Sequence, residues 1–151
     1  MSTAEVLRRL RLFLLVLSSL LFVGTLLELY LVNHKEDAIQ WLAFVFAGLG
    51  LLVTLAALAR RGPKTVLLLR WTMLLVIVGS LFGIYEHVSN NIAFEREIQP
   101  NATLSRLLWR GVSGANPLLA PGTLAIAALL SLAATYKYWI NSGSEAQIIN
   151  N

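Results

Sequence analysis

The chain has 151 residues, a formal net charge of +4, 57% hydrophobic residues and only 13% charged residues. This composition is typical of a membrane protein and excludes an ordinary soluble domain, and the length suits a single transmembrane domain, residues 1–151. Cysteine is absent from the chain, which excludes disulfides, thiolate metal ligands and thiol redox chemistry.

Four apolar runs predict an all-α fold, a membrane four-helix bundle. Each run has enough residues to cross a hydrocarbon core of about 30 Å as a helix. The first run follows a charged front like that of a signal peptide, but it is too long for one and no small-residue cleavage site follows it. We therefore expect it to be retained as a span. The expected spans are residues 12–32, 38–59, 65–86 and 118–139.

The segment between the third and fourth spans, residues 87–117, predicts an outer loop with helical parts. No glycine or proline follows the third span before Pro100, so its helix is expected to continue beyond the membrane to about Ile98. From Thr103 to Gly111, leucines fall on one side of a helix and arginines on the other. This pattern predicts a short helix in the membrane interface.

The basic residues predict an orientation. They gather before the first span, between the second and third spans, and at the end of the fourth, all on one side of a four-span chain. By the positive-inside rule, we expect a multi-pass protein of the plasma (bacterial inner) membrane with both termini cytoplasmic. The C-terminal tail, residues 141–151, is polar. The cations do not cluster on one face, so no nucleic-acid partner is expected.

The densest group of ligand-type side chains lies where the third span becomes polar. Gly79, Gly83, His87, Asn91 and Glu95 recur at four-residue steps, and neighbours at this spacing share a helix face. Nitrogen and oxygen ligands in such a row are able to hold a divalent metal ion or relay protons. The candidate metal residues are His87, Glu86, Asn91, Glu95, His34 and Glu28.

Simpler interpretations of these residues stay open. The helix becomes polar where water begins, and its histidine and asparagine then bond to the backbone of neighbouring loops. Glu28, near the outer end of the first span, either reaches the interface or pairs with an outer cation. The candidate cations are Arg96, Arg106 and Arg110. No cofactor is indicated apart from a divalent metal ion.

Small residues mark two expected helix-packing surfaces. Gly79 and Gly83 stand four residues apart in the third span, and Ala127, Ser131 and Thr135 recur at the same spacing in the fourth. Such rows allow the backbones of neighbouring membrane helices to approach closely. We therefore expect both rows at helix contacts.

The chain contains no nucleophile paired with a base, no phosphate-binding glycine loop and no buried acidic pair, so we expect neither enzyme activity nor catalytic residues. The segments YEHVSN and NPLLAPG resemble uncharacterised small bacterial four-helix integral membrane proteins over about residues 80–125. The resemblance implies a fold and no particular activity.

Two functional hypotheses follow from these patterns. The first is association in the lipid bilayer, as an accessory or structural subunit of a membrane complex or as a homo-oligomer, because packing rows favour helix contacts. The alternative is binding or transport of a divalent metal ion or protons by the outer histidine, glutamate and asparagine side chains.

Overall fold

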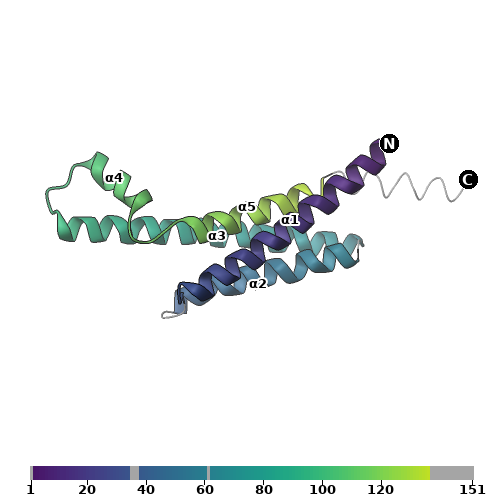
Figure 1. Ribbon diagram of the computed structural model, residues 1–151, viewed down its shortest axis with the longest axis horizontal. Helices are drawn as coiled ribbons and strands as arrows, with labels where there is room; N and C mark the ends of the chain where they lie inside the picture. The colour runs from purple at the N-terminus through teal and green to yellow at the C-terminus, as the bar shows by residue number, and fades with distance from the viewer. Residues whose placement is uncertain (1, 35–37, 61, 137–151) are drawn as a thin grey trace, which may run out of the picture.

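The protein is built from helices (Figure 1). The computed structural model describes residues 2–34, 38–60 and 62–136, and these ranges contain five helices and no strand. The helices are α1 (Thr3–Leu31), α2 (Ala38–Ala59), α3 (Pro63–Ile98), α4 (Leu104–Ser113) and α5 (Leu119–Ala133). The predicted all-α class is therefore confirmed.

Local signals set where the helices begin. Ser2 caps α1, since its side chain accepts a hydrogen bond from the backbone N–H of Glu5 at 3.2 Å. Thr103 caps α4 in the same way through the backbone N–H of Arg106 at 3.4 Å. Such caps satisfy donors that the first helical turn leaves free. Pro63 opens α3 in its first turn, where its missing N–H is not needed.

Three helices, α1, α2 and α3, are long and apolar enough to cross a membrane. The helix of α1 begins at Thr3, ahead of the apolar run, and an ion pair of 2.6 Å between Arg9 and Glu5 lies in this extension. α3 runs unbroken to Ile98, which confirms the predicted continuation of the third helix. α5 has 15 residues and ends at Ala133. It is shorter than predicted, and residues 137–139 of the expected span lie outside the described residues.

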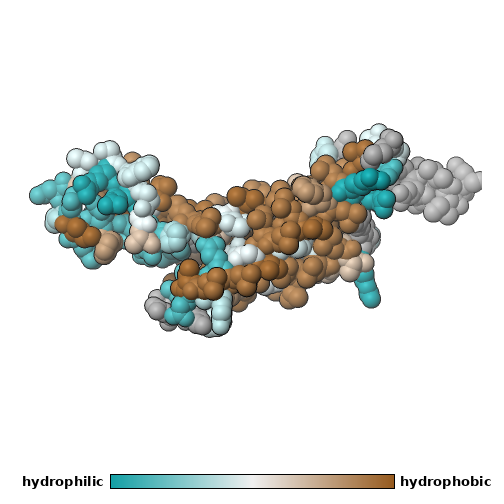
Figure 2. All heavy atoms as spheres, in the orientation of Figure 1, coloured by the Kyte–Doolittle hydropathy of each residue, from teal (hydrophilic) through white to brown (hydrophobic). Residues whose placement is uncertain are grey.

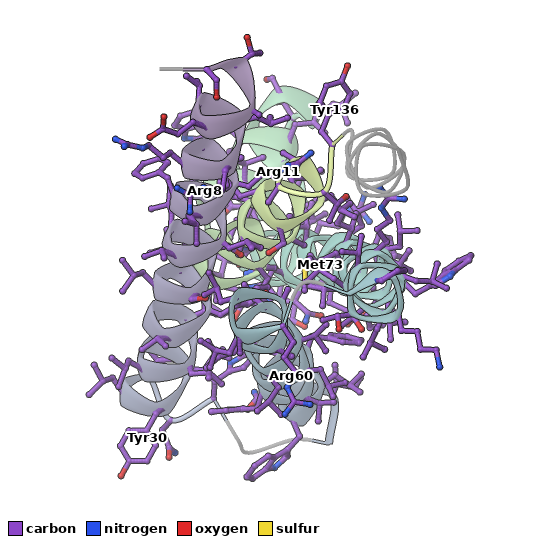
Figure 3. The ribbon with its side chains drawn as sticks, turned by 90° about the vertical axis from the view of Figure 1, so that its right-hand side faces the viewer. Arg8, Arg11, Tyr30, Arg60, Met73 and Tyr136 are labelled. Atoms are coloured by element: carbon purple, nitrogen blue, oxygen red, sulfur yellow. The ribbon has the colours of Figure 1, made fainter. Side chains whose placement is uncertain are left out.

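Two arginines hold the end of α5. Arg70 on α3 donates from Nε to Thr135 Oγ1 and from a terminal nitrogen to Thr135 O, both at 3.0 Å. Arg11 on α1 donates to Tyr136 O at 2.6 Å and lies next to it in Figure 3. The backbone N–H groups of Thr135 and Tyr136 bond three residues back, in tighter turns than an α-helix. Cations at these last carbonyls stabilise the helix end.

Four helices, α1, α2, α3 and α5, pack along one another (Figure 1). α1 and α3 each pack against α2 and α5, and α2 also contacts α5, whereas α1 and α3 do not meet within the described ranges. The core between them is apolar and includes Phe22, Met73, Val76, Ala47 and Ala127, all fully buried. Met73 lies among the helices in the view along the long axis (Figure 3).

The outward surface of these helices is apolar (Figure 2). Large exposed apolar side chains include Phe13 on α1, Leu52 on α2 and Val78 on α3. Figure 2 shows this hydrophobic surface over the middle of the long axis, with polar residues toward both ends. Such an exterior is the inverse of a soluble protein and fits helices surrounded by lipid.

The two ends of the molecule differ in charge and shape. One, the basic end, holds the start of α1, the end of α2 and the start of α3, with the cations Arg8, Arg9, Arg11, Arg60, Lys64 and Arg70. At the other, α3 extends past α1 and α2, and α4 folds back on it (Figure 1). The 36 residues of α3 are about 54 Å long, well over a hydrocarbon core of about 30 Å. We call residues 86–113 the arm and this end the arm end.

Candidate functional site

A cavity of about 740 Å³ lies at the arm end, between α1, α2, α3 and the start of α5. Cavities of this size hold drug-sized ligands. It exists because α1 and α3 do not meet there and because small residues form parts of its wall. Those small residues are Ala43, Gly79, Gly83 and Ala120.

The cavity is polar toward the arm end and apolar further into the helices. Its polar side chains include Glu28, His34, Glu86, His87 and Asn90. Its apolar wall includes Leu42, Phe46, Phe82, Pro121 and Leu124. Along α3, the distance from the polar residues to the deepest lining positions is two helical turns, about 10 Å. The cavity therefore combines a charged mouth with an apolar interior.

The end of α1 positions His34. Asn33 adopts the left-handed conformation (φ 53°), which asparagine tolerates better than most residues. The N–H of His34 then bonds to Leu29 O at 3.0 Å, and the N–H of Asn33 bonds to Tyr30 O at 3.2 Å. These two bonds are the Schellman ending of a helix. As a result the chain turns back and His34 faces α3.

His34 meets His87 of α3 at the mouth of the cavity. The ring centroids are 6.0 Å apart and the rings are tilted by 38°. Nδ1 of His87 is buried and has no hydrogen-bond partner among the described residues. Burial lowers the pKa of His34 below its ordinary value of 6.5, and the nearby His87 lowers this pKa further. Both effects favour the neutral form of His34.

Glu28 and Glu86 are the two acids that line the cavity. Both side chains are half-buried, and neither has a hydrogen-bond or ion-pair partner within the described ranges. Two of the cations considered as partners for Glu28, namely Arg106 and Arg110, contact another acid instead. The mouth of the cavity thus carries two carboxylates that have no ion-pair partner among the described residues.

Asn91 joins the arm to the start of α5. Its side-chain nitrogen donates to Gly111 O and to Asn116 O, both at 3.0 Å, and its oxygen accepts from the N–H of Asn116 at 2.8 Å. The residue is 2% exposed. Buried amides are normally satisfied by such bonds, and Asn91 here fixes the loop that follows α4.

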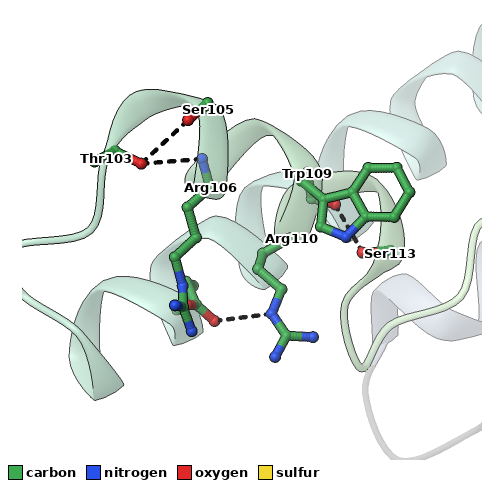
Figure 4. Close-up of polar contacts among 7 residues, drawn as sticks. Thr103, Ser105, Arg106, Trp109, Arg110 and Ser113 are labelled. Carbon is green, nitrogen blue, oxygen red and sulfur yellow. Dashed lines mark hydrogen bonds and ion pairs between the residues drawn. The ribbon is translucent and has the colours of Figure 1, made fainter.

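Glu95 anchors α4 on α3. One carboxylate oxygen accepts from Nε of Arg106 at 2.6 Å, and the other lies 3.4 Å from Nε of Arg110. The two arginines reach down from neighbouring turns of α4, whereas Trp109 points away from them (Figure 4). The Glu95 side chain is only 7% exposed, and the two arginines are about half exposed. These contacts hold α4 against α3 in the middle of the arm.

The six predicted metal residues therefore fall into two groups. His34, His87, Glu28 and Glu86 line the cavity. Asn91 and Glu95 lie further along the arm, where protein groups occupy their polar atoms. Within the described ranges, no group of three or more histidine, aspartate and glutamate side chains is arranged to hold a metal ion.

The small-residue rows lie at contacts within the chain. A Cβ on Gly79 would overlap the ring of Phe46 on α2, and a Cβ on Gly83 would lie 3.3 Å from Pro121 on α5. Of the row on α5, Ala127 and Ser131 are fully buried and Thr135 is 6% exposed. These residues place α3 and α5 close to their neighbours.

The row on α5 also makes polar contacts with α1 and α2. The hydroxyl of Ser18 donates to Ala127 O at 2.7 Å and lies 2.6 Å from the hydroxyl of Ser131. Thr54 Oγ1 is 3.3 Å from the same Ser131 oxygen. Hydroxyls that bond between helices stabilise packing where water is absent.

Several functional features have no clear signal in the sequence. The apolar wall of the cavity comes from four helices, and only the spacing of Gly79 and Gly83 pointed to this region. The pairing of Glu95 with Arg106 and Arg110 depends on how the loop after α3 turns back. The asparagine before His34 was the one local sign that α1 ends in a sharp turn.

Comparisons of the chain with protein-family models, with curated proteins and with solved structures found no match.

Proposed function

We propose that this chain is a four-span protein of the plasma membrane that works by association, as an accessory or structural subunit of a membrane complex or as a homo-oligomer. In this proposal α1, α2, α3 and α5 form a four-helix bundle in the lipid bilayer. In this proposal the basic end faces the cytoplasm and both termini are cytoplasmic, in keeping with the positive-inside rule. The arm stands on the outer side, and the C-terminal end of α4 returns to the membrane interface.

The observation that carries this proposal is the arm itself. α3 continues about 20 Å past the length that a membrane requires. The buried bonds of Asn91 and Glu95 make this extension and α4 one rigid unit. A helix that only crossed the membrane would not need such bracing. Rigid elements are also better placed than loops to present a binding surface.

The tip of the arm presents apolar side chains. Phe94 and Ile98 on α3, and Leu104 and Leu108 on α4, are each more than half exposed. In this proposal they lie beyond the lipid that covers the other apolar side chains. Apolar groups that gather on a water-facing surface mark interaction sites. The tip is therefore the part of the arm that we assign to a protein partner or to a second copy.

The test is the mass of the assembly extracted in native lipid. The variant Phe94→Ala/Ile98→Ala/Leu104→Ala is expected to release the partner or dissociate the oligomer. The control Phe13→Ala/Leu20→Ala/Leu52→Ala removes similar area from the exposed, lipid-facing sides of α1 and α2, and it should leave the assembly unchanged. A wild-type chain that is a monomer without a stoichiometric partner, or a tip variant of unchanged mass, would refute association through the arm.

A second candidate function is binding of protons or a divalent metal ion at the mouth of the cavity. The observation that favours it is the approach of His34 and His87, from different helices, with Nδ1 of His87 buried and unpartnered among the described residues. Imidazole nitrogens are ligands that zinc accepts, although among the described residues no third histidine, aspartate or glutamate is arranged with them to hold a metal ion. Zinc titration of the purified protein tests it: His87→Ala should abolish binding, and no zinc uptake by the wild type would end this hypothesis.

A further inference from the structure

We propose that the cavity at the arm end binds a lipophilic organic cation, with its ammonium group facing Glu28 and Glu86 and its apolar body against Phe46, Phe82 and Leu124. This inference goes beyond association through the arm. It also differs from the metal hypothesis, because it uses the apolar wall as well as the mouth.

The charge of the mouth selects a cation. Glu28 and Glu86 line the cavity without a cationic partner in the described part of the chain. Arg106 and Arg110 of the arm do not neutralise them, since both pair with Glu95, and Arg96 forms no ion pair with either acid among the described residues. An unpaired carboxylate at the edge of a low-dielectric region gains most from an opposite charge that also donates hydrogen bonds.

The histidines complete the polar part of the site. His34 lines the same mouth, and its ring centroid lies 6.0 Å from that of His87. Nδ1 of His87 is a buried atom that still requires a hydrogen bond. An imidazole nitrogen without a proton accepts from an N–H donor, which a primary or secondary ammonium supplies.

The interior of the cavity selects an apolar body. Two turns separate Glu86 from Gly79, so a group bound at the mouth has about 10 Å of wall beneath it. This wall includes the rings of Phe46 and Phe82 and the buried side chain of Leu124. Apolar burial supplies the affinity of most small-molecule sites, and aromatic rings also attract a nearby cation.

Two sources offer this chemistry. One is a free amphiphilic amine, and the other is the headgroup of phosphatidylethanolamine. The experiment measures binding of labelled decylammonium to the full chain in phosphatidylcholine nanodiscs, with empty nanodiscs as the blank and decanol as the neutral probe. Competition when phosphatidylethanolamine replaces part of the lipid identifies the headgroup as the ligand. Saturable binding without this competition identifies a free amine.

Variants test the polar mouth and the apolar wall of the site separately. Glu28→Gln and Glu86→Gln should each weaken decylammonium binding roughly tenfold, by loss of one charge-assisted contact, and should leave decanol unaffected. Ala43→Leu fills the apolar wall and should weaken both probes. The control is Glu97→Gln, because Glu97 is exposed on the arm and does not line the cavity.

The proposal is overturned if decylammonium binds no better than decanol, or if neither probe binds above the blank. It is also overturned if Glu86→Gln binds like Glu97→Gln. Monodisperse elution and an unchanged melting temperature show that a variant is folded. If Glu28→Gln fails this check, Glu86→Gln and Ala43→Leu still decide the question. The assembly mass of the same samples reports on association independently, so either proposal can fail alone.

Discussion

The Glu95 side chain of α3 holds α4 in place in the arm. It lies eleven and fifteen positions before Arg106 and Arg110 in the chain, and the structure brings all three together across the loop after α3. The carboxylate is buried while the guanidinium groups stay about half exposed. The arginines therefore keep much of their hydration, and the net gain from the pair is modest.

The variant Glu95→Gln should loosen α4 from α3. We expect the free energy of local opening to fall by about 1–2 kcal/mol, because charge-assisted bonds are replaced by weaker neutral ones. Hydrogen–deuterium exchange of residues 104–113 measures this opening and should accelerate about tenfold or more. The exposed Glu97→Gln serves as the control. Equal exchange in both variants would show that the apolar contacts of Leu107 and Gly111 suffice to hold α4.

Because of His34, the stability of the folded protein depends on pH. In the unfolded chain it takes up its proton near pH 6.5, whereas in the folded protein its pKa is lower because of burial and of His87. As the pH falls below 6.5, the unfolded state therefore binds more protons than the folded state, and folding loses stability. The effect is complete once the folded histidine is protonated too. Above pH 6.5 this contribution is constant.

We accordingly expect the melting temperature in neutral detergent to fall as the pH drops below about 6.5. Among the described residues, the ionisable groups that line the cavity with His34 are Glu28, Glu86 and His87. In the variant His34→Gln, the fall of the melting temperature below pH 6.5 should be smaller, because the contribution of His34 is lost. The melting temperature at pH 7.5 should be nearly unchanged. A profile identical to that of the wild type would contradict this assignment.

At the scale of elements, the contact between α1 and α2 depends on one glycine of a pair. Gly48 and Gly50 both lie in α2, yet a Cβ on Gly50 would come within 2.5 Å of the Phe22 ring, whereas a Cβ on Gly48 would meet nothing within 4 Å. Phe22 is fully buried, so its ring can yield to an added Cβ only by displacing the side chains packed around it. Gly50 is therefore required by packing and Gly48 is not.

Gly50→Ala should lower the free energy of unfolding by about 1–3 kcal/mol through overpacking. Gly48→Ala, the same change two residues away, should be neutral or slightly stabilising, since alanine favours the helix over glycine. Thermal unfolding of the two variants in one detergent provides the comparison. If both variants melt alike, the close approach of α2 to Phe22 is incorrect.

Much of the helix pattern was predictable from local signals. The long apolar runs and the absence of breakers before Pro100 predicted α1, α2 and the full extent of α3. The end of α5 was not predictable, because it depends on Arg11 and Arg70 from two other helices. The cavity was not predictable either, because it results from the separation of α1 and α3. No single segment of the sequence specifies that separation.

For the molecule as a whole, the proposed function depends on which helices cross the membrane. α1, α2 and α3 are long enough by themselves, whereas α5 has 15 residues and about 22 Å of helix. α5 packs against both α1 and α3, and hydrogen-bonded turns continue from its end to Tyr136, where Arg11 and Arg70 bond to the last carbonyls. We expect the bilayer to adapt to this shorter span at modest cost.

The most direct measurement is the labelling of single cysteines by a membrane-impermeant maleimide in intact cells. The chain has no cysteine of its own, so each introduced thiol reports one position. Ser105→Cys on α4 should react from outside, whereas Lys64→Cys before α3 and Tyr136→Cys after α5 should react only once the membrane is permeabilised. Labelling of Tyr136→Cys from the same side as Ser105→Cys would show that α5 does not cross, and the four-span account would be wrong.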